Sequence, residues 1–230
     1  MNIALILAGG NGSRMGQPTP KQFLSLCGKP VLMRTVEAFV FHPEIDAVCL
    51  VSGEEWSGRV KYLTEGYDKI CGVTDGGRTR RESAFRGLTF LMERYSPDDI
   101  VLIHDAARPL VSARVISDSI RCLTRGEWKA CTAAIPVQDT VLESGDGQSV
   151  TSVLERNRLF AVQTPQTFRL GTIYEGHRTL PPEREVTDDA GILTSQGIPV
   201  GLVAGEKRNL KITSPEDMAV AECYLTVDRQ

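Results

Sequence analysis

Features typical of metal, redox, membrane and nucleic-acid-binding proteins are missing from this sequence. None of its six cysteines forms a CxxC pair or has a histidine at metal-ligand spacing, so we expect buried structural thiols rather than a metal or redox site. No apolar run reaches the ~18 residues that a membrane helix needs. The formal net charge is −3, whereas proteins that bind DNA or RNA are usually basic. We therefore expect neither a membrane span nor a nucleic-acid partner.

Two kinds of catalytic motif are missing as well. His42, His104 and His177 form no Ser/His/Asp or Cys/His arrangement, which favours direct transfer without a covalent intermediate. The glycines after the first apolar run have the spacing of neither the dinucleotide-binding fingerprint nor the P-loop. A nicotinamide-dependent oxidoreductase also needs an acidic residue at the end of its second strand, where this sequence has Ser52 and Gly53. An oxidoreductase is therefore the weaker hypothesis.

The composition fits one globular domain in a reducing compartment. A chain of 230 residues, 41% hydrophobic and 24% charged, can bury a core, and no linker or repeat divides residues 1–230. Met1 leads straight into an apolar run without a signal peptide. Together with the unpaired cysteines, this predicts a cytoplasmic protein.

Apolar runs alternate with segments of helical periodicity along the chain. This alternation predicts an α/β fold with a mostly parallel sheet and helices on both of its faces. The expected strands span residues 3–7, 47–51, 70–73, 100–104, 130–135, 161–164, 200–203 and 210–212. The expected helices span residues 29–42, 56–67, 80–94, 115–125, 170–180, 188–196 and 215–225.

One polar stretch, residues 139–158, interrupts this alternation. It contains Gly145-Asp146-Gly147, a turn signal, between two strand-like pieces at 140–142 and 150–154. We interpret the stretch as a protruding hairpin, with a mobile surface loop as the alternative. Because exposed hairpin edges invite pairing with another chain, we expect a homodimer contact there.

The loop after the first strand combines glycines with cations. Gly9, Gly10 and Gly12 would let the backbone approach a phosphate chain with its amide groups directed at the anion. Arg14 and Lys21 follow, and fixed cations stabilise the charge that develops during phosphoryl transfer. The pattern predicts a nucleotide-phosphate site, and two surface cations on a polar loop are the alternative.

A carboxylate follows the apolar run at 100–104. In doubly wound sheets, ligands bind at the carboxyl ends of the strands, and Asp105 is expected at such an end. A carboxylate there suits Mg²⁺, which one or two carboxylates hold together with substrate phosphates. Arg108 is suited to pair with a phosphate through two hydrogen bonds. Capping of the next helix by Asp105 is the alternative.

A second glycine turn, within residues 75–83, carries several arginines and leads into a helix. The N-terminus of a helix with cations nearby binds anions, which makes Gly77 and Arg78 candidates for nucleotide contacts. Ser83 could hydrogen-bond a base edge. A plain solvated turn remains the alternative. Further donors near expected strand ends carry no stronger interpretation by themselves: Thr140, Arg156, Thr164, Thr187 and Lys211.

Seven motifs together resemble those of the 2-C-methyl-D-erythritol 4-phosphate cytidylyltransferase family. In chain order they read LAGGNGSRMG with PKQF, DGGRTRRES, HDAARPLVS, PVQDT, ERNRLF with QTPQTF, VTDD, and NLKITSPEDMAVAE. The resemblance runs nearly end to end, and this order of motifs is specific for the family. It implies a Rossmann-like sheet of the nucleotide-diphospho-sugar transferase kind. It also implies a β-arm, matched by residues 139–158, that interlocks two subunits.

The resemblance also implies substrates and site residues. CTP and a small phosphorylated polyol would react, with Mg²⁺ or another divalent cation as cofactor, to release pyrophosphate. The positions that match catalytic residues are Arg14, Lys21, Arg156 and Lys211. The positions that match nucleotide contacts are Ala8, Gly9, Gly10, Gly12, Gly77, Arg78, Ser83 and Asp105, the last of them also the metal ligand. The positions that match acceptor contacts are Arg108, Thr140, Arg156, Thr164, Thr187 and Lys211. Thr140 and Arg156 would reach the acceptor from the arm of the other subunit.

The acceptor separates two enzyme hypotheses. Residues 156–157, the VTDD motif and the C-terminal motif fit the methylerythritol phosphate enzymes, which we favour. Gly9 stands where those enzymes usually have alanine, and this variation is frequent in the sister family that makes CDP-ribitol from ribitol 5-phosphate for cell-envelope polymers. Arg78 stands where many members carry an acidic residue.

A nucleotide-binding regulator that performs no chemistry is a hypothesis from another class. Such a protein would not need Arg14, Lys21, Asp105 and Lys211 together. Whether CTP is consumed separates it from the enzymes.

Overall fold

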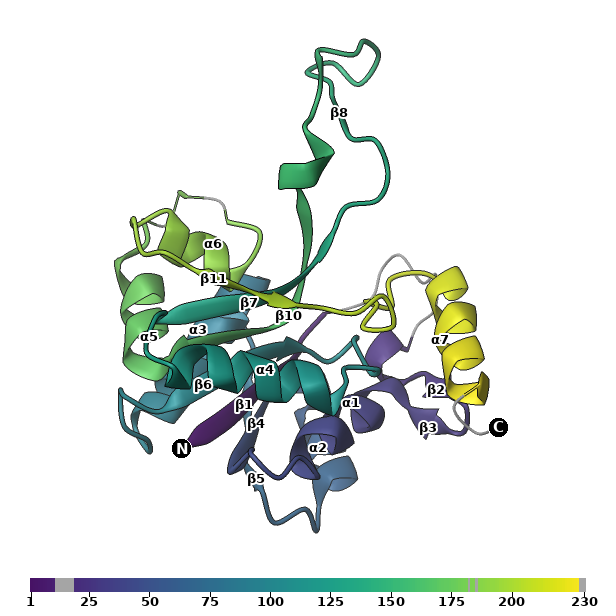
Figure 1. Ribbon diagram of the computed structural model, residues 1–230. Helices are drawn as coiled ribbons and strands as arrows, with labels where there is room; N and C mark the ends of the chain where they lie inside the picture. The colour runs from purple at the N-terminus through teal and green to yellow at the C-terminus, as the bar shows by residue number, and fades with distance from the viewer. Residues whose placement is uncertain (11–18, 182, 185, 228–230) are drawn as a thin grey trace.

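A seven-stranded sheet forms the centre of this computed structural model, which describes residues 1–10, 19–181, 183–184 and 186–227. The strands lie in the order β11-β7-β10-β6-β1-β4-β5 (Figure 1). Their bounds are β1 (Asn2–Ala8), β4 (Ala47–Ser52), β5 (Ile70–Asp75), β6 (Ile100–Asp105), β7 (Ala130–Pro136), β10 (Phe160–Arg169) and β11 (Gly201–Ala204). Only β10 runs antiparallel to its neighbours, β6 and β7. The expected mostly parallel α/β sheet is therefore confirmed.

Helices cover both faces of the sheet, because successive side chains of a buried strand point to opposite faces. Leu5 of β1 packs in a cluster with residues of three helices: α3 (Arg80–Met92), α5 (Leu170–Thr179) and α6 (Asp189–Thr194). Its neighbour Ile6 packs in a second cluster, with residues of three others: α1 (Val31–Val40), α2 (Glu54–Thr64) and α4 (Ala113–Thr124). Alternate side chains of β1 thus contribute to two hydrophobic cores, one on each face of the sheet.

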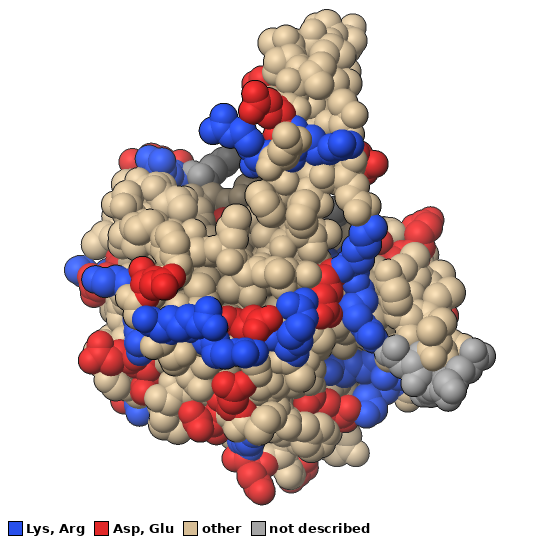
Figure 2. All heavy atoms as spheres, in the orientation of Figure 1, with Lys and Arg blue, Asp and Glu red and all other residues tan. Residues whose placement is uncertain are grey.

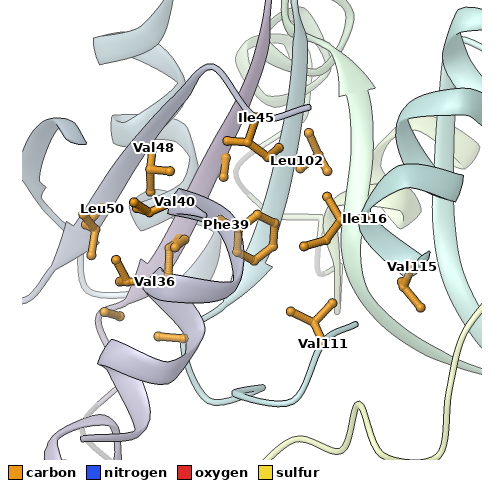
Figure 3. Packing of buried hydrophobic residues seen from close by; sticks show 14 of the residues in the cluster. Val36, Phe39, Val40, Ile45, Val48, Leu50, Leu102, Val111, Val115 and Ile116 are labelled. Atoms are coloured by element: carbon orange, nitrogen blue, oxygen red, sulfur yellow. The ribbon is translucent and has the colours of Figure 1, made fainter. Parts of the chain in front are cut away.

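Phe39 of α1 lies near the middle of the second cluster. Figure 3 shows its ring facing Ile116 of α4, with Leu102 of the sheet close by. Its side chain is fully buried, and its ring centroid lies 4.9 Å from that of His104 on β6. Burying an aromatic ring of this size contributes on the order of 1.5–3 kcal/mol. The contact fixes α1 against the strand that ends at Asp105.

The polar stretch at 139–158 forms an arm that stands clear of the body (Figures 1 and 2). Its two strands, β8 (Leu142–Glu143) and β9 (Ser152–Val153), pair antiparallel, with Leu142 opposite Val153. The 3₁₀ helix η3 (Arg156–Arg158) then leads into β10. The hairpin is confirmed, but its strands are shorter than expected.

The C-terminal helix α7 (Pro215–Val227) packs beside a small hairpin formed by β2 (Ser25–Leu26) and β3 (Lys29–Pro30). Neither short strand was expected from the sequence. The helix expected at 29–42 begins only at Val31, because Pro30 has an extended ψ of 140°. Proline is common just before or at the first turn, where a missing N–H costs nothing.

The strand expected at 210–212 is wrong. These residues belong to no strand, although Ile212 is fully buried with Leu26 and Ala221 in a third apolar cluster. The N–H of Ile212 donates one hydrogen bond, of 2.8 Å, to the carbonyl of Ala107. The apolar pattern therefore reflected burial beneath α7. Strand β10 was underestimated, since only 161–164 of Phe160–Arg169 was expected.

Candidate active site

A cleft of about 470 Å³ opens at the carboxyl ends of β1 and β6. Five chain segments line it: the ends of β1 and β6 with the residues that follow them, the 3₁₀ helix at residues 21–23, the turn after β5 with the start of α3, and the segment before α7. Its lining residues include Ala8, Gly9, Gly10, Lys21, Gly77, Arg78, Ser83, Asp105 and Lys211. The structure thus brings together nine residues that the sequence had placed at a nucleotide or catalytic site.

The start of the first loop is tied to the 3₁₀ helix η2 (Lys21–Phe23) by Gln22. The buried side-chain amide of Gln22 donates hydrogen bonds to the carbonyls of Ala8 and Gly10, at 2.7 and 3.1 Å. This bond pair sets the backbone at Gly10 close to Lys21, which lines the cleft. The predicted residues Gly12 and Arg14 lie outside the described residues.

The second glycine turn is locked by the start of α3. Thr79 caps the helix by accepting the N–H of Glu82, and the Glu82 carboxylate accepts the N–H of Arg78 at 2.8 Å. Ser83 Oγ accepts the N–H of Gly77 at 3.0 Å. A Cβ at Gly77 would lie 2.2 Å from Glu82 side-chain atoms, so a larger residue there would force the turn or Glu82 to shift. The buried Ser83 side chain therefore stabilises this turn through its hydrogen bond with Gly77.

Asp105 is the electrostatic centre of the cleft. Its Oδ2 lies 2.8 Å from Lys211 Nζ and 3.7 Å from Arg108 Nε, and its Oδ1 lies 3.5 Å from Arg80 Nε. Burial acts to raise the pKa of Asp105, but the charges of Arg80 and Lys211 outweigh it and hold that pKa well below its usual range. Asp105 does not cap α4, whose N-cap is Ser112. The carboxylate is ionised and faces a cationic cleft.

Thr164 and His104 support Asp105 from behind. Thr164 Oγ1 accepts the N–H of Asp105 at 3.1 Å and lies 3.0 Å from His104 Nδ1. Burial lowers the pKa of His104 to about 4, so the ring is neutral. Its Nε2–H then donates to the carbonyl of Arg108 at 3.1 Å, and the Thr164 hydroxyl donates to Nδ1. The hydroxyl of Thr164, expected at the acceptor, is thus engaged within the protein.

Arg108 is also more buried than expected, at 9% exposed. Its Nη1 donates to the carbonyl of Asn209 at 2.8 Å. Burial lowers the pKa of the Arg108 guanidinium, against the opposing effect of Asp105. Arg108 does not line the described cleft.

Three predicted acceptor contacts lie apart from the cleft of their own chain. Thr140 and Arg156 are exposed on the arm, where Arg156 Nη1 donates to the carbonyl of Gln138 at 2.8 Å. Thr187 is exposed just before α6. Within a single chain, the structure does not bring these three residues together with Asp105.

Two residues at the cleft were missed by the sequence analysis. Arg80 lines the cleft and forms an ion pair with Asp105. The sequence has three arginines within residues 78–81, and nothing in the pattern indicates which of them faces the cleft. Gln22 belongs to the PKQF motif, which supports the family resemblance, but the sequence analysis assigned no role to this residue.

The fit of a divalent cation depends on Asp105 alone. Among residues 1–10, 19–181, 183–184 and 186–227, no group of at least three His, Cys, Asp or Glu side chains could hold a metal ion. A single ionised carboxylate in a nucleotide site still fits Mg²⁺, since phosphate oxygens and water supply the remaining ligands. The residues therefore suit a cation that arrives with a nucleotide.

The fold and the cleft define a class of enzyme. A glycine loop at the end of β1, an ionised carboxylate at the end of β6 and several cations around them are the equipment of a nucleotidyltransferase. The chain belongs to the 2-C-methyl-D-erythritol 4-phosphate cytidylyltransferase family, whose model matches residues 2–227. The resemblance seen in the seven motifs is confirmed.

Several known proteins are similar over almost their whole length. A 2-C-methyl-D-erythritol 4-phosphate cytidylyltransferase from Rubrobacter xylanophilus is 42% identical over 228 residues, which cover 97% of this chain and 94% of that protein. A ribitol-5-phosphate cytidylyltransferase from Lactiplantibacillus plantarum is 36% identical and is covered to 98%, as is this chain. The crystal structure of 4-diphosphocytidyl-2C-methyl-D-erythritol synthase from Anaerococcus prevotii has a TM-score of 0.83, with 31% identity and 98% coverage of both chains.

Proposed function

We propose that the protein transfers the cytidylyl group of CTP to 2-C-methyl-D-erythritol 4-phosphate, releasing pyrophosphate. The product is 4-diphosphocytidyl-2-C-methyl-D-erythritol, an intermediate of non-mevalonate isoprenoid synthesis. The observation that carries the proposal is the cleft itself, in which Arg80 and Lys211 contact the ionised Asp105 and Lys21 lines the same cavity, in a member of this family.

CTP would enter between the two glycine turns. The backbone at Ala8, Gly9 and Gly10 faces the cleft and suits phosphate and ribose. The turn at Gly77 and Arg78 suits the base, since the N–H groups bonded to Ser83 and Glu82 fix its backbone carbonyls as acceptors at the cleft.

In the reaction, an oxygen of the acceptor phosphate attacks the α-phosphorus of CTP in line with the departing pyrophosphate. That oxygen is already anionic near neutral pH, so the site needs no general base. Lys21, with Arg14, would stabilise the negative charge that develops on the triphosphate. Lys211, beside Asp105, would orient the acceptor phosphate toward the reacting phosphorus.

Mg²⁺ or another divalent cation would be held by Asp105 and the triphosphate. It would offset phosphate charge in the transition state, which is its usual contribution to phosphoryl transfer. The backbone N–H that Asp105 donates to Thr164 Oγ1 fixes the main chain from which this carboxylate extends.

Assembly as a homodimer through residues 139–158 is part of the same proposal. The arm exposes apolar side chains, with Leu142 at 51% and Val153 at 65%. Oligomers of identical chains are usually symmetric, so each arm would meet the other chain in the same way. Arg156 and Thr140 would then complete the acceptor site of the neighbouring chain.

We also place the reaction in the cytoplasm, without a nucleic-acid partner. All six cysteines are free, which suits a reducing compartment. Within the described part of the chain, no helix has the length and apolarity required to cross a membrane.

A second acceptor, ribitol 5-phosphate, is favoured by one observation. The relative from Lactiplantibacillus plantarum carries that name at 36% identity. The two acceptors differ in chain length and branching while sharing the phosphate that Lys211 would bind.

The deciding experiment is pyrophosphate release from CTP and Mg²⁺, with each acceptor supplied at equal concentration. We expect release to be much faster with methylerythritol phosphate. Faster pyrophosphate release with ribitol 5-phosphate would show that this compound is the acceptor, while the assignment as a cytidylyltransferase would stand. No release with either, under conditions in which the protein remains folded, would contradict both enzyme assignments.

A further inference from the structure

A line of contacting polar side chains connects α5, on one face of the sheet, to the cleft. His177 of α5 contacts Asp189 of α6, Asp189 contacts Arg80 of α3, and Arg80 contacts Asp105 of β6. The mechanism described above uses Asp105 and does not use the two residues behind Arg80. His177 and Asp189 therefore need a separate explanation.

Asp189 is a buried charge with a different partner on each carboxylate oxygen. Its Oδ1 lies 3.0 Å from His177 Nε2, and its Oδ2 lies 2.8 Å from Arg80 Nη1. The side chain is 1% exposed. Burial acts to raise the pKa of Asp189, but the charge of Arg80 outweighs it and the pKa is lowered. A buried carboxylate of this kind is stable only while both contacts persist.

Arg80 is shared unequally between two carboxylates. It lies 2.8 Å from Asp189 and 3.5 Å from Asp105, while its own side chain is 30% exposed at the cleft. Asp189 thus draws the guanidinium back from Asp105. Without that pull, Arg80 would pair fully with Asp105 and compete with Lys211 and with a divalent cation for its oxygens.

His177 fixes the carboxylate that exerts this pull. Its side chain is fully buried, and its ring stacks on Phe85 with an interplanar angle of 8° and a centroid distance of 6.0 Å. Gln166 Oε1 accepts the N–H groups of Asp189 and Ala190, which fixes the backbone at the start of α6. With the backbone and one oxygen held, the second oxygen of Asp189 points at Arg80.

We propose that His177 and Asp189 are positioning residues that hold Arg80 between two carboxylates and so prevent it from neutralising Asp105. They touch no substrate and act on the cleft through Arg80. The kinetic test rests on the proposed function, whereas the geometric test does not.

The kinetic test compares two replacements of His177. His177→Phe keeps a flat ring against Phe85 but removes the donor to Asp189, so we expect kcat to fall about tenfold, the lower end for supporting residues of a site. His177→Gln keeps an N–H donor and should restore kcat to within about threefold of the wild type. The KM for CTP should change little in both variants, because the base and ribose contacts lie at the glycine turns.

A double-mutant cycle tests the route through Arg80. In the Arg80→Ala background, His177→Phe should change kcat by less than about twofold, because the side chain on which His177 acts is gone. An unchanged tenfold loss in that background would overturn the proposal. The matched control is His42→Phe, which alters another buried histidine, bonded to the Ala113 carbonyl. It should lower the melting temperature without lowering kcat.

The geometric test needs no acceptor. The ¹⁵N–¹H NMR signal of Arg80 Nε, assigned by its loss in Arg80→Ala, should shift in His177→Phe and stay near its wild-type position in His177→Gln. An unshifted signal in His177→Phe would overturn the positioning role. If wild-type protein released no pyrophosphate with either acceptor, the proposed function would fail while this test still decided the role of His177.

Discussion

The cleft and the arm differ in how their side chains are held. Asp105 is buried and fixed by Lys211, Arg80 and the Thr164 hydroxyl, all within one chain. The arm has only two-residue strands, and both Leu142 and Val153 are more than half exposed. One chain is therefore sufficient to build the cleft around Asp105, whereas the proposed acceptor site would also need the arm of a second chain.

The largest expected effect lies in the cleft. Lys21→Ala removes a cation expected at the triphosphate, so kcat should fall about 10²–10³-fold, as for loss of one transition-state donor. Circular dichroism should show an unchanged fold, because Lys21 lies on a short 3₁₀ helix at the rim. Near wild-type turnover would exclude Lys21 from the chemistry. Lys29→Ala, which breaks a surface ion pair with Glu37, is a matched control.

The next effect tests whether the arm serves the other chain. Lys21→Ala and Arg156→Ala homodimers should each be nearly inactive. Mixing them after unfolding and refolding should recover about a quarter of the wild-type activity, because half of the dimers are mixed and each has one intact site.

No recovery would mean that Arg156 acts in the cleft of its own chain, whereas an Arg156→Ala homodimer that stayed active would mean that Arg156 acts in neither cleft. Refolding each variant alone provides the control for losses during the procedure. If either variant regained activity when refolded alone, the assignment of the cleft to one chain and of the arm to the other would be wrong.

A third effect concerns the support behind Asp105. The pKa of His104 is about 4 in the folded chain and about 6.5 when unfolded, so the unfolded state binds more protons between these values. Stability should therefore fall as pH falls through this window, by about 2 kcal/mol between pH 7 and pH 5. Urea unfolding at the two pH values measures it.

The control for this pH effect is His104→Gln, which does not titrate. It should show a smaller difference between pH 7 and pH 5, although it is less stable at pH 7. An equal difference in the variant would assign the loss to other groups.

The smallest expected effects are on CTP affinity, and they differ between the two glycine turns. Gly77→Ala places a Cβ 2.2 Å from Glu82 and should weaken CTP binding about tenfold, a cost on the order of 1–3 kcal/mol for a forced shift. Gly9→Ala meets only Ser83 Oγ, at 3.4 Å, which is ordinary contact. Its affinity for CTP, measured by calorimetry, should stay within about twofold. A large loss of CTP affinity in Gly9→Ala would mean that the loop after β1 distinguishes the methylerythritol phosphate enzymes from their ribitol phosphate sister family.

The sequence predicted the cleft better than the acceptor site. Ala8, Gly77, Asp105 and Lys211 converge because parallel strands and their loops meet at one edge of the sheet, which a linear pattern can predict. The hydroxyl of Thr164, which we expect at the acceptor, also bonds Asp105 and His104 within the chain. Only the packing of β10 against β6 shows this.

The elements that sequence patterns missed have tertiary causes. Ile212 is apolar because α7 covers it, which produced a false strand. Strand β10 is polar in its middle, where Gln163 and Gln166 bond side chains and backbone of neighbouring segments, so its apolar signal was short. Arg80 and Asp189 lie 109 positions apart, and no local pattern indicates such a pair.

The position of β1 in the sheet has a consequence for synthesis of the chain. It is the first strand of the sheet to be translated, yet both of its neighbours come later: Ile3 pairs with Ala47 on one side and with Val101 on the other. Such long-range parallel pairing forms slowly and leaves apolar segments exposed in the meantime. The nascent chain must therefore keep this apolar strand from aggregating until β6 has left the ribosome.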